Sequence, residues 1–157
     1  PQCYAALGSL ICDEKQPLTR GGFTFNTPLS HTLTRGHFTF ALVWDLACSI
    51  YENYKALQQI TNHHKSYVWA CGGGMQSDVL RQLLANLFGK EIRVRNNYRQ
   101  ATVAGCAFIC NRALNPTDHH NESDFSSVFP DPQLATSQWY QTWKNNRSAL
   151  KNSTVCP

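Results

Sequence analysis

The stretch that most constrains the fold runs from Tyr67 to Val94 and reads YVWACGGGMQSDVLRQLLANLFGKEIRV. Its first residues form a short apolar run with β-branched and aromatic members, which predicts a strand covered on both faces. Three glycines end the strand, and Ser77 and Asp78 can then cap a helix that stops at Gly89. EIRVR predicts the next strand. We expect the helix to bury Val79, Leu80, Leu83, Leu84, Leu87 and Phe88.

The glycines Gly72, Gly73 and Gly74 can form a ligand site or only turn the chain. A strand that passes through glycine into a helix brings backbone N–H groups and the positive end of the helix dipole together, where anions and nucleotides bind. Glycine also lets a flat ligand approach the backbone. However, GGGMQSD lacks the GK[ST] ending of a P-loop and is not GxGxxG. From the residues alone the two interpretations are equal, and Ser77 is equally well explained as an N-cap.

Apolar periodicity predicts the other elements. GFTFNT alternates as a short strand does, with Phe23 and Phe25 on one face. Residues 37–60 carry apolar side chains every three or four positions, which predicts the longest helix. A further helix is predicted at 101–114, where small residues around Gly105 permit a close approach to a neighbour or ligand. A last helix, with three aromatic residues packed on the body, is predicted at 135–146.

Two segments show no such period. The first 22 residues are predicted to be rich in loops, and residues 117–128 are predicted to form a polar tail. The alternation of strands and helices elsewhere predicts an α/β domain whose helices pack against a largely parallel sheet.

Composition limits the partners of the chain. It has 157 residues, of which 42% are hydrophobic and 15% charged, and its net charge of +4 is spread along the sequence. This favours one globular domain, with no nucleic acid or membrane among its partners, and RVRNNYR is explained as a solvated strand end. The sequence starts without methionine, a basic leader or a long apolar segment. We therefore expect no signal peptide or membrane span, and a chain that is part of something longer.

The seven cysteines include no CxxC pair and no metal spacing with histidine. We expect buried thiols in a reducing, cytoplasmic compartment and no metal site. Cys106 and Cys110 share a helix face, for which core packing is the expected role. The adjacent His63 and His64 cannot lie on one face and are not expected to bind metal.

The order of several motifs resembles one known family. GFTFNTPLSHTLTRGHFTFALVWDLACSIYENYKAL, GGGMQSDVLRQLLANLFGKEIRV and ATVAGCAFICNRAL together resemble the C-terminal domain of the FGGY family of carbohydrate kinases. The likeness covers roughly Gly21 to Leu114, and VFPDPQLATSQWYQTWK is similar to the closing segment of the family. Within the family it is closest to deoxy-ketose kinases such as L-fuculokinase, in which a TRGHF-like stretch leads into the long helix.

This resemblance implies a ribonuclease-H-like, actin-like ATPase fold, as the C-terminal half of a two-domain sugar kinase. Such kinases hold MgATP and a sugar between the two domains and transfer the γ-phosphoryl group to a sugar hydroxyl. The glycine motif lies against the adenosine, so by resemblance Gly73 and Ser77 would contact the nucleotide while Gly72 and Gly74 shape the turn. Gly105 falls at the Gly-Ala-Ala helix start of the family, here Gly-Cys-Ala, and should permit close packing.

The resemblance also divides the chain. It implies a divergent opening segment (1–22), the nucleotide-side domain (23–116) and a polar tail with a terminal helix (117–157). The long helix departs from the family, because the usual Arg-Ala and Glu-Gly pairs are replaced by Phe40-Ala41 and Trp44-Asp45. This puts in doubt any ion pair or hinge built on those positions.

The catalytic residues are expected upstream of this sequence. Phosphoryl transfer needs phosphate-binding loops, Mg²⁺ ligands and a base that orients the hydroxyl. No aspartate here has the glycine-rich context that could supply them; the candidates are Asp13, Asp45, Asp78, Asp118, Asp124 and Asp131. We therefore expect the chain alone to lack kinase activity and to need an N-terminal kinase domain as its partner.

Two alternatives stay open at this point. The chain could be a non-catalytic, actin-like nucleotide-binding or assembly module. A small secreted glycoprotein is also possible, supported only by the sequons at Asn121, Asn146 and Asn152.

Overall fold

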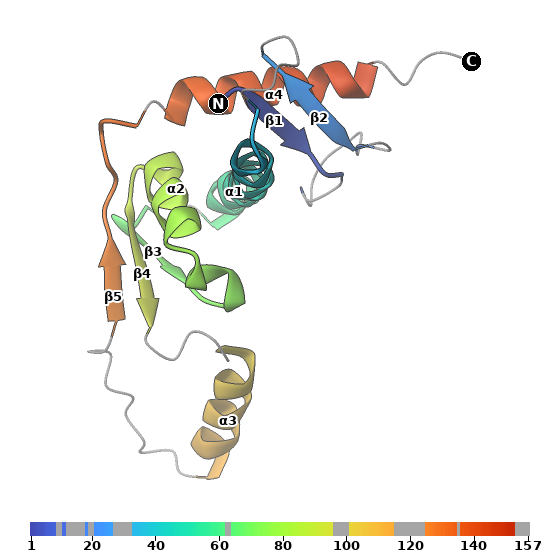
Figure 1. Cartoon of the computed structure of the whole chain (residues 1–157). Helices are drawn as coiled ribbons and strands as arrows, with labels where there is room; N and C mark the ends of the chain where they lie inside the picture. The colour runs from blue at the N-terminus through green and yellow to red at the C-terminus, as the bar shows by residue number, and fades with distance from the viewer. Residues whose placement is uncertain are drawn as a thin grey trace. The chain divides into compact units, whose positions relative to one another are not determined.

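The computed structural model describes residues 1–8, 11, 18, 21–26, 33–61, 64–95, 101–114, 125–134 and 136–152. It divides into two compact units, one formed by 1–64 with 132–157 and the other by 65–131. We call them unit 1 and unit 2, and each is described by itself (Figure 1).

Unit 1 is a two-stranded sheet packed against a long helix. Strands β1 (Cys3–Ala6) and β2 (Gly22–Phe25) are antiparallel, and helices α1 (Arg35–Thr61) and α4 (Thr136–Asn152) follow. Every residue of β1 is buried, so the prediction that this part of the N-terminal segment is a loop is wrong. The strand escaped notice because four residues buried on both faces show no alternation.

The predicted strand face at Phe23 and Phe25 is confirmed. Both rings pack edge to face on Phe38 of α1. The centroid of the Phe38 ring lies 5.2 Å from that of Phe23 and 5.9 Å from that of Phe25. Beneath them, Cys3, Ala5 and Ala41 form a small fully buried core. Small side chains there let the sheet lie close to the helix.

Helix α1 is confirmed within two residues of its predicted bounds, but its apolar stripe is buried only in the first half. Trp44 and Ala47 have no exposed surface, whereas Leu57 is 56% exposed. The predicted terminal helix is also confirmed. Trp139 packs edge to face on Trp44 at 5.9 Å, and Trp143 is 1% exposed.

A buried carboxylate fastens three elements of unit 1 together. Asp45 is fully buried in α1 and accepts hydrogen bonds from the indole N–H of Trp143 in α4 (2.7 Å) and from the Leu7 backbone N–H just after β1 (2.9 Å). A second polar contact joins α1 to α4, because Lys55 donates to the Tyr140 hydroxyl at 2.5 Å and to Glu52 at 2.9 Å.

Unit 2 contains a three-stranded sheet in the order β3-β4-β5. Its elements are β3 (Tyr67–Ala70), the 3-10 turn η1 (Gly73–Gln76), α2 (Asp78–Phe88), β4 (Glu91–Arg95), α3 (Ala101–Leu114) and β5 (Phe125–Val128). Strands β3 and β4 are parallel, as predicted, with Val68 opposite Ile92. The core joins Ile92 and Val94 to the leucines of α2.

Strand β5 lies within the segment predicted to be a polar tail, so that prediction is wrong for Phe125–Val128. The strand pairs antiparallel with β4, and the described sheet is therefore mixed and not largely parallel. The two adjacent serines at its centre break the alternation of apolar and polar residues that would predict a strand. Ser127 donates to Glu91 at 2.5 Å, and hydrogen bonds from Arg93 and Ser127 hold the pKa of Glu91 below its ordinary value.

Three burial predictions for unit 2 are also wrong. Strand β3 is not covered on both faces, because Trp69 is 39% exposed and lies beside Phe125. Val79 is 53% exposed, since it lies off the leucine stripe of α2. Cys71, Cys106 and Cys110 are exposed, so among the described cysteines the prediction of buried thiols is confirmed only for Cys3 and Cys48.

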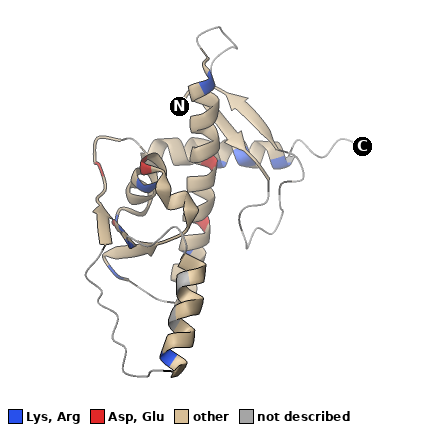
Figure 2. Ribbon diagram, turned by 60° about the horizontal axis from the view of Figure 1, so that its bottom comes forward, with Lys and Arg blue, Asp and Glu red and all other residues tan. Residues whose placement is uncertain are grey.

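Three further features of the described residues concern their basic side chains, their hydropathy and their metal-binding groups. The lysines and arginines are spread over several elements, among them α1, α2, β4, α3 and α4 (Figure 2). No described helix is long and apolar enough to cross a membrane. Among the described histidines, cysteines and acidic residues, no group of three could hold a metal ion. Cys12, Cys156, His63 and Asn121 lie outside the described residues.

We predict that Asp45→Ala lowers the free energy of unfolding by about 3 kcal/mol, because it leaves the buried indole N–H of Trp143 and the partly buried backbone N–H of Leu7 without their acceptor. Trp143→Phe removes one donor and should cost about 1.5 kcal/mol. Urea unfolding of both single variants and the double variant checks this. A double variant whose loss equals the sum of the two single losses would show that the two side chains do not interact.

A second prediction concerns pH. Burial, and the nearby charges of Asp45 and Glu52, raise the pKa of the Cys48 thiol well above its ordinary value of 9.0. Above that pH the unfolded chain releases the thiol proton while the folded chain keeps it. This contribution to stability is therefore fully present below about pH 9 and falls as the pH rises, by up to about 1.4 kcal/mol per pH unit.

Cys48→Ala should consequently lose less stability than the parent chain between about pH 8 and about pH 10, measured by urea unfolding. Cys71→Ala, which removes an exposed thiol, is the control and should lose as much as the parent. Equal losses in the parent and Cys48→Ala would contradict the prediction.

Candidate functional site

The glycine turn of unit 2 joins β3 to α2 and has a defined backbone. Gly72 has φ of 96°, a conformation that side chains with a Cβ rarely adopt, so glycine is required there. The 3-10 turn then closes with hydrogen bonds from the Met75 N–H to the Gly72 carbonyl (3.1 Å) and from the Ser77 N–H to the Gly74 carbonyl (3.2 Å). Met75 points inward and is 6% exposed, which anchors the turn on the core.

The predicted helix caps are confirmed. Ser77 is the N-cap of α2, and its Oγ accepts the Leu80 N–H at 3.2 Å. Gly89 ends the helix in the left-handed conformation with φ of 61°. Asp78 in the first turn forms an ion pair with Arg81. An acidic residue there also complements the positive end of the helix dipole.

The glycines differ in what surrounds them. A Cβ built on Gly73 would meet no atom within 4 Å, whereas one on Gly74 would contact Leu80 Cδ2 at 3.5 Å. Gly73 therefore faces open space and Gly74 faces the helix. Neither position is forced to be glycine by the fold of the described residues.

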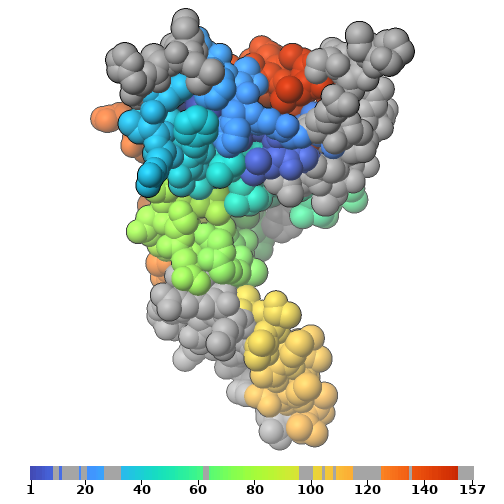
Figure 3. All heavy atoms as spheres, turned by 45° about the vertical axis from the view of Figure 1, so that its right-hand side comes forward, coloured from blue at the N-terminus to red at the C-terminus, as the bar shows by residue number. Residues whose placement is uncertain are grey.

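The start of η1 and the N-cap of α2 carry hydrogen-bonding groups that have no partner in their own turn. The first N–H groups of a helical turn have no intrahelical acceptor, which applies to Gly73 and Gly74. Ser77 is exposed, and because its oxygen serves as the cap acceptor, its O–H is free to donate. The turn and α2, green to lime in Figure 3, lie at the surface of unit 2.

Two amide side chains of α2, Gln82 and Asn86, hold this helix against the segment after β5, and we call this set of contacts the clamp. No role was predicted for them from the sequence. Gln82 donates to Asn86 Oδ1 at 3.0 Å and to the carbonyl of Phe129 at 2.9 Å, and Asn86 Oδ1 accepts the Asp131 N–H at 2.7 Å. They tie α2 to the segment that follows β5. Their signal in the sequence is two amides four positions apart in the stretch 82–88, which is otherwise apolar.

Gly105 lies in α3 and not in this turn. A Cβ there would meet no atom within 4 Å among the described residues, so its role in close packing stays a prediction.

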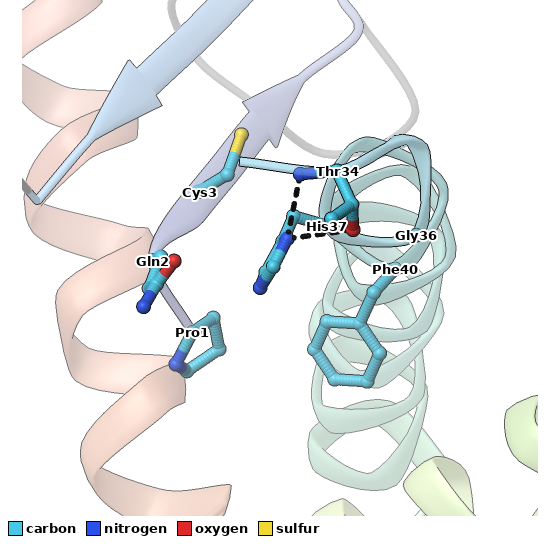
Figure 4. A pocket seen from close by; sticks show the side chains of 7 residues that line it. All are labelled: Pro1, Gln2, Cys3, Thr34, Gly36, His37 and Phe40. Carbon is cyan, nitrogen blue, oxygen red and sulfur yellow. Dashed lines mark hydrogen bonds between the residues drawn. The ribbon is translucent and has the colours of Figure 1, made fainter. Parts of the chain in front are cut away.

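Unit 1 has a cavity of about 310 Å³ at the start of α1, lined by Pro1, Gln2, Cys3, Thr34, Gly36, His37 and Phe40 (Figure 4). The ring of His37 enters it between β1 and the helix. Its Nδ1 accepts the Thr34 N–H at 3.0 Å and lies 3.0 Å from Thr34 Oγ1. This pairing caps α1, so the main polar group of the cavity has a structural role.

Comparison with known proteins covers almost the whole chain. The C-terminal domain of the FGGY family of carbohydrate kinases matches residues 13–114, starting upstream of Gly21. The putative sugar kinase YoaC of Bacillus subtilis (strain 168) is 39% identical over 151 residues, which are 96% of this chain and 31% of YoaC. The chain thus spans about a third of the length of that relative.

Solved structures show the same fold. A ligand-bound xylulose kinase from Lactobacillus acidophilus matches 83% of this chain and 27% of its own with a TM-score of 0.63 and 24% identity. A xylulose kinase from Rhodospirillum rubrum matches 95% of this chain and 30% of its own with a TM-score of 0.66 and 21% identity.

The predicted fold class is therefore confirmed as the ribonuclease-H-like, actin-like ATPase fold in its C-terminal half. The chain belongs to the FGGY family of carbohydrate kinases, and what it contains is the C-terminal domain.

Proposed function

We propose that the chain forms the adenosine-binding side of an ATP-dependent carbohydrate kinase. The observation that carries this proposal is the open space above Gly73, on a turn that is otherwise anchored to the core. The fold requires glycine at Gly72 but not at Gly73, and a ligand lying against the backbone accounts for a glycine there.

The proposed contacts follow from the free groups of the turn. The base or ribose of the nucleotide lies over Gly73, whose N–H faces it. The Ser77 hydroxyl donates to the ligand while its oxygen keeps the cap. Gly72 and Gly74 set the path of the backbone. The clamp of Gln82 and Asn86 holds α2, and with it Ser77, in a fixed position.

The chemical step requires the rest of such a kinase. An N-terminal domain would supply the phosphate-binding loop and the catalytic base, and would bind the sugar with this domain. Mg²⁺ would enter with ATP and neutralise charge on the phosphoryl group. Of the described aspartates, Asp45 has its role in unit 1, Asp78 lies in the first turn of α2, and Asp131 lies after β5, where its backbone N–H bonds to Asn86. We accordingly assign residues 23–116 to nucleotide binding and place the reaction of the complete kinase in the cytoplasm.

We expect the chain to bind ATP weakly, because only one side of the cleft is in it. A titration followed by amide NMR should shift the signals of residues 72–77 and leave those of α4 in place. If none of the signals of the turn moves, the turn is not a nucleotide site.

Gly73→Val should abolish these shifts and change the free energy of unfolding by less than about 1 kcal/mol, because the new side chain enters open space that the ligand would fill. Gly74→Ala is the matched control. Its methyl group faces Leu80 and should leave binding intact. Binding by Gly73→Val as strong as that of the parent would make Gly73 a turn residue only.

A further inference from the structure

We propose that Gln76 reads the edge of the bound base and sets the preference of the site for adenine. This inference rests on the proposed function, and it adds a specificity-determining residue to the glycine turn.

The position of Gln76 is fixed by its neighbours. Met75 before it is buried, and Ser77 after it begins α2 through the bond from Leu80. Gln76 is the last residue of the 3-10 turn and its side chain is exposed. A long polar side chain thus extends into solvent from a rigid base, beside the two residues proposed to hold the nucleotide.

Gln76 is also chemically distinct from the other amides nearby. Between Gly72 and Gly89 the chain has two others, Gln82 and Asn86, and both are engaged in the clamp on the segment after β5. The carboxamide of Gln76 forms no hydrogen bond with any described residue. It therefore remains available to a ligand.

A carboxamide matches the edge of adenine. It offers an acceptor and donors side by side, and at its N6–N7 edge adenine presents an amino donor beside a ring-nitrogen acceptor, whereas guanine presents two acceptors, O6 and N7, at the same edge. A carboxylate at the same place could only accept. It would favour guanine, which presents N–H donors at N1 and N2, and would oppose a ring-nitrogen acceptor of adenine. The identity of residue 76 should therefore change the ratio of affinities for the two bases.

The test measures ADP and GDP dissociation constants of the 157-residue chain by amide NMR titration, for the parent, Gln76→Ala and Gln76→Glu. Gln76→Ala should weaken ADP binding about fivefold, the lower end expected for an amide–adenine pair open to water. Gln76→Glu should shift the ADP-to-GDP affinity ratio toward GDP by about tenfold. The ratio is the decisive quantity, because a new negative charge repels the phosphates of both nucleotides alike.

Gln138→Ala, which changes an exposed glutamine of α4 in unit 1, is the control and should alter neither constant. If ADP binds to the turn but both Gln76 variants keep the ADP-to-GDP affinity ratio of the parent, Gln76 does not recognise the base. The proposed nucleotide site would still be supported by that result. If neither nucleotide shifts a signal of residues 72–77 in the parent, the proposed function and this inference fail together.

Discussion

The carboxylate of Asp45 is the contact on which unit 1 depends most. It joins its own helix, α1, to the residue just after β1 and to α4, through partners that lie 38 and 98 positions away in the sequence. A fully buried carboxylate is costly unless donors surround it. Here an indole N–H and a backbone N–H supply them, so the same burial that makes the group costly also fixes the relative positions of the three elements. Trp44 and Trp139 then pack beside this centre.

Asp45 also explains a departure from the family pattern. Where the family has a Glu-Gly pair, this chain has Trp44-Asp45. At this departure from the family pattern the structure has a hydrogen bond, which the indole of Trp143 donates to Asp45. Trp143, known from the sequence only as one of three aromatic residues in a terminal helix, provides its donor.

Local features were predictable from the sequence and distant pairings were not. The cap at Ser77, the stop at Gly89 and the parallel pair β3–β4 depend on residues within one short stretch, whose propensities and spacing are visible in the sequence. Strands β1 and β5 escaped prediction because each is four residues long and is stabilised by a partner far along the chain. In the candidate site, Gly73 and Ser77 were predicted from the family resemblance. The open space beside Gly73 and the exposure of Gln76 depend on the three-dimensional structure and could not be predicted from the sequence.

The order of the two units along the chain has a consequence for biosynthesis. Unit 2 is one continuous segment, whereas unit 1 is made from both ends of the sequence. A ribosome releases residues in order, so every residue of unit 2 has left it before α4 has. Until then Asp45 lacks its indole donor. The nascent chain therefore completes unit 2 first, and the packing of α1 against α4 forms last.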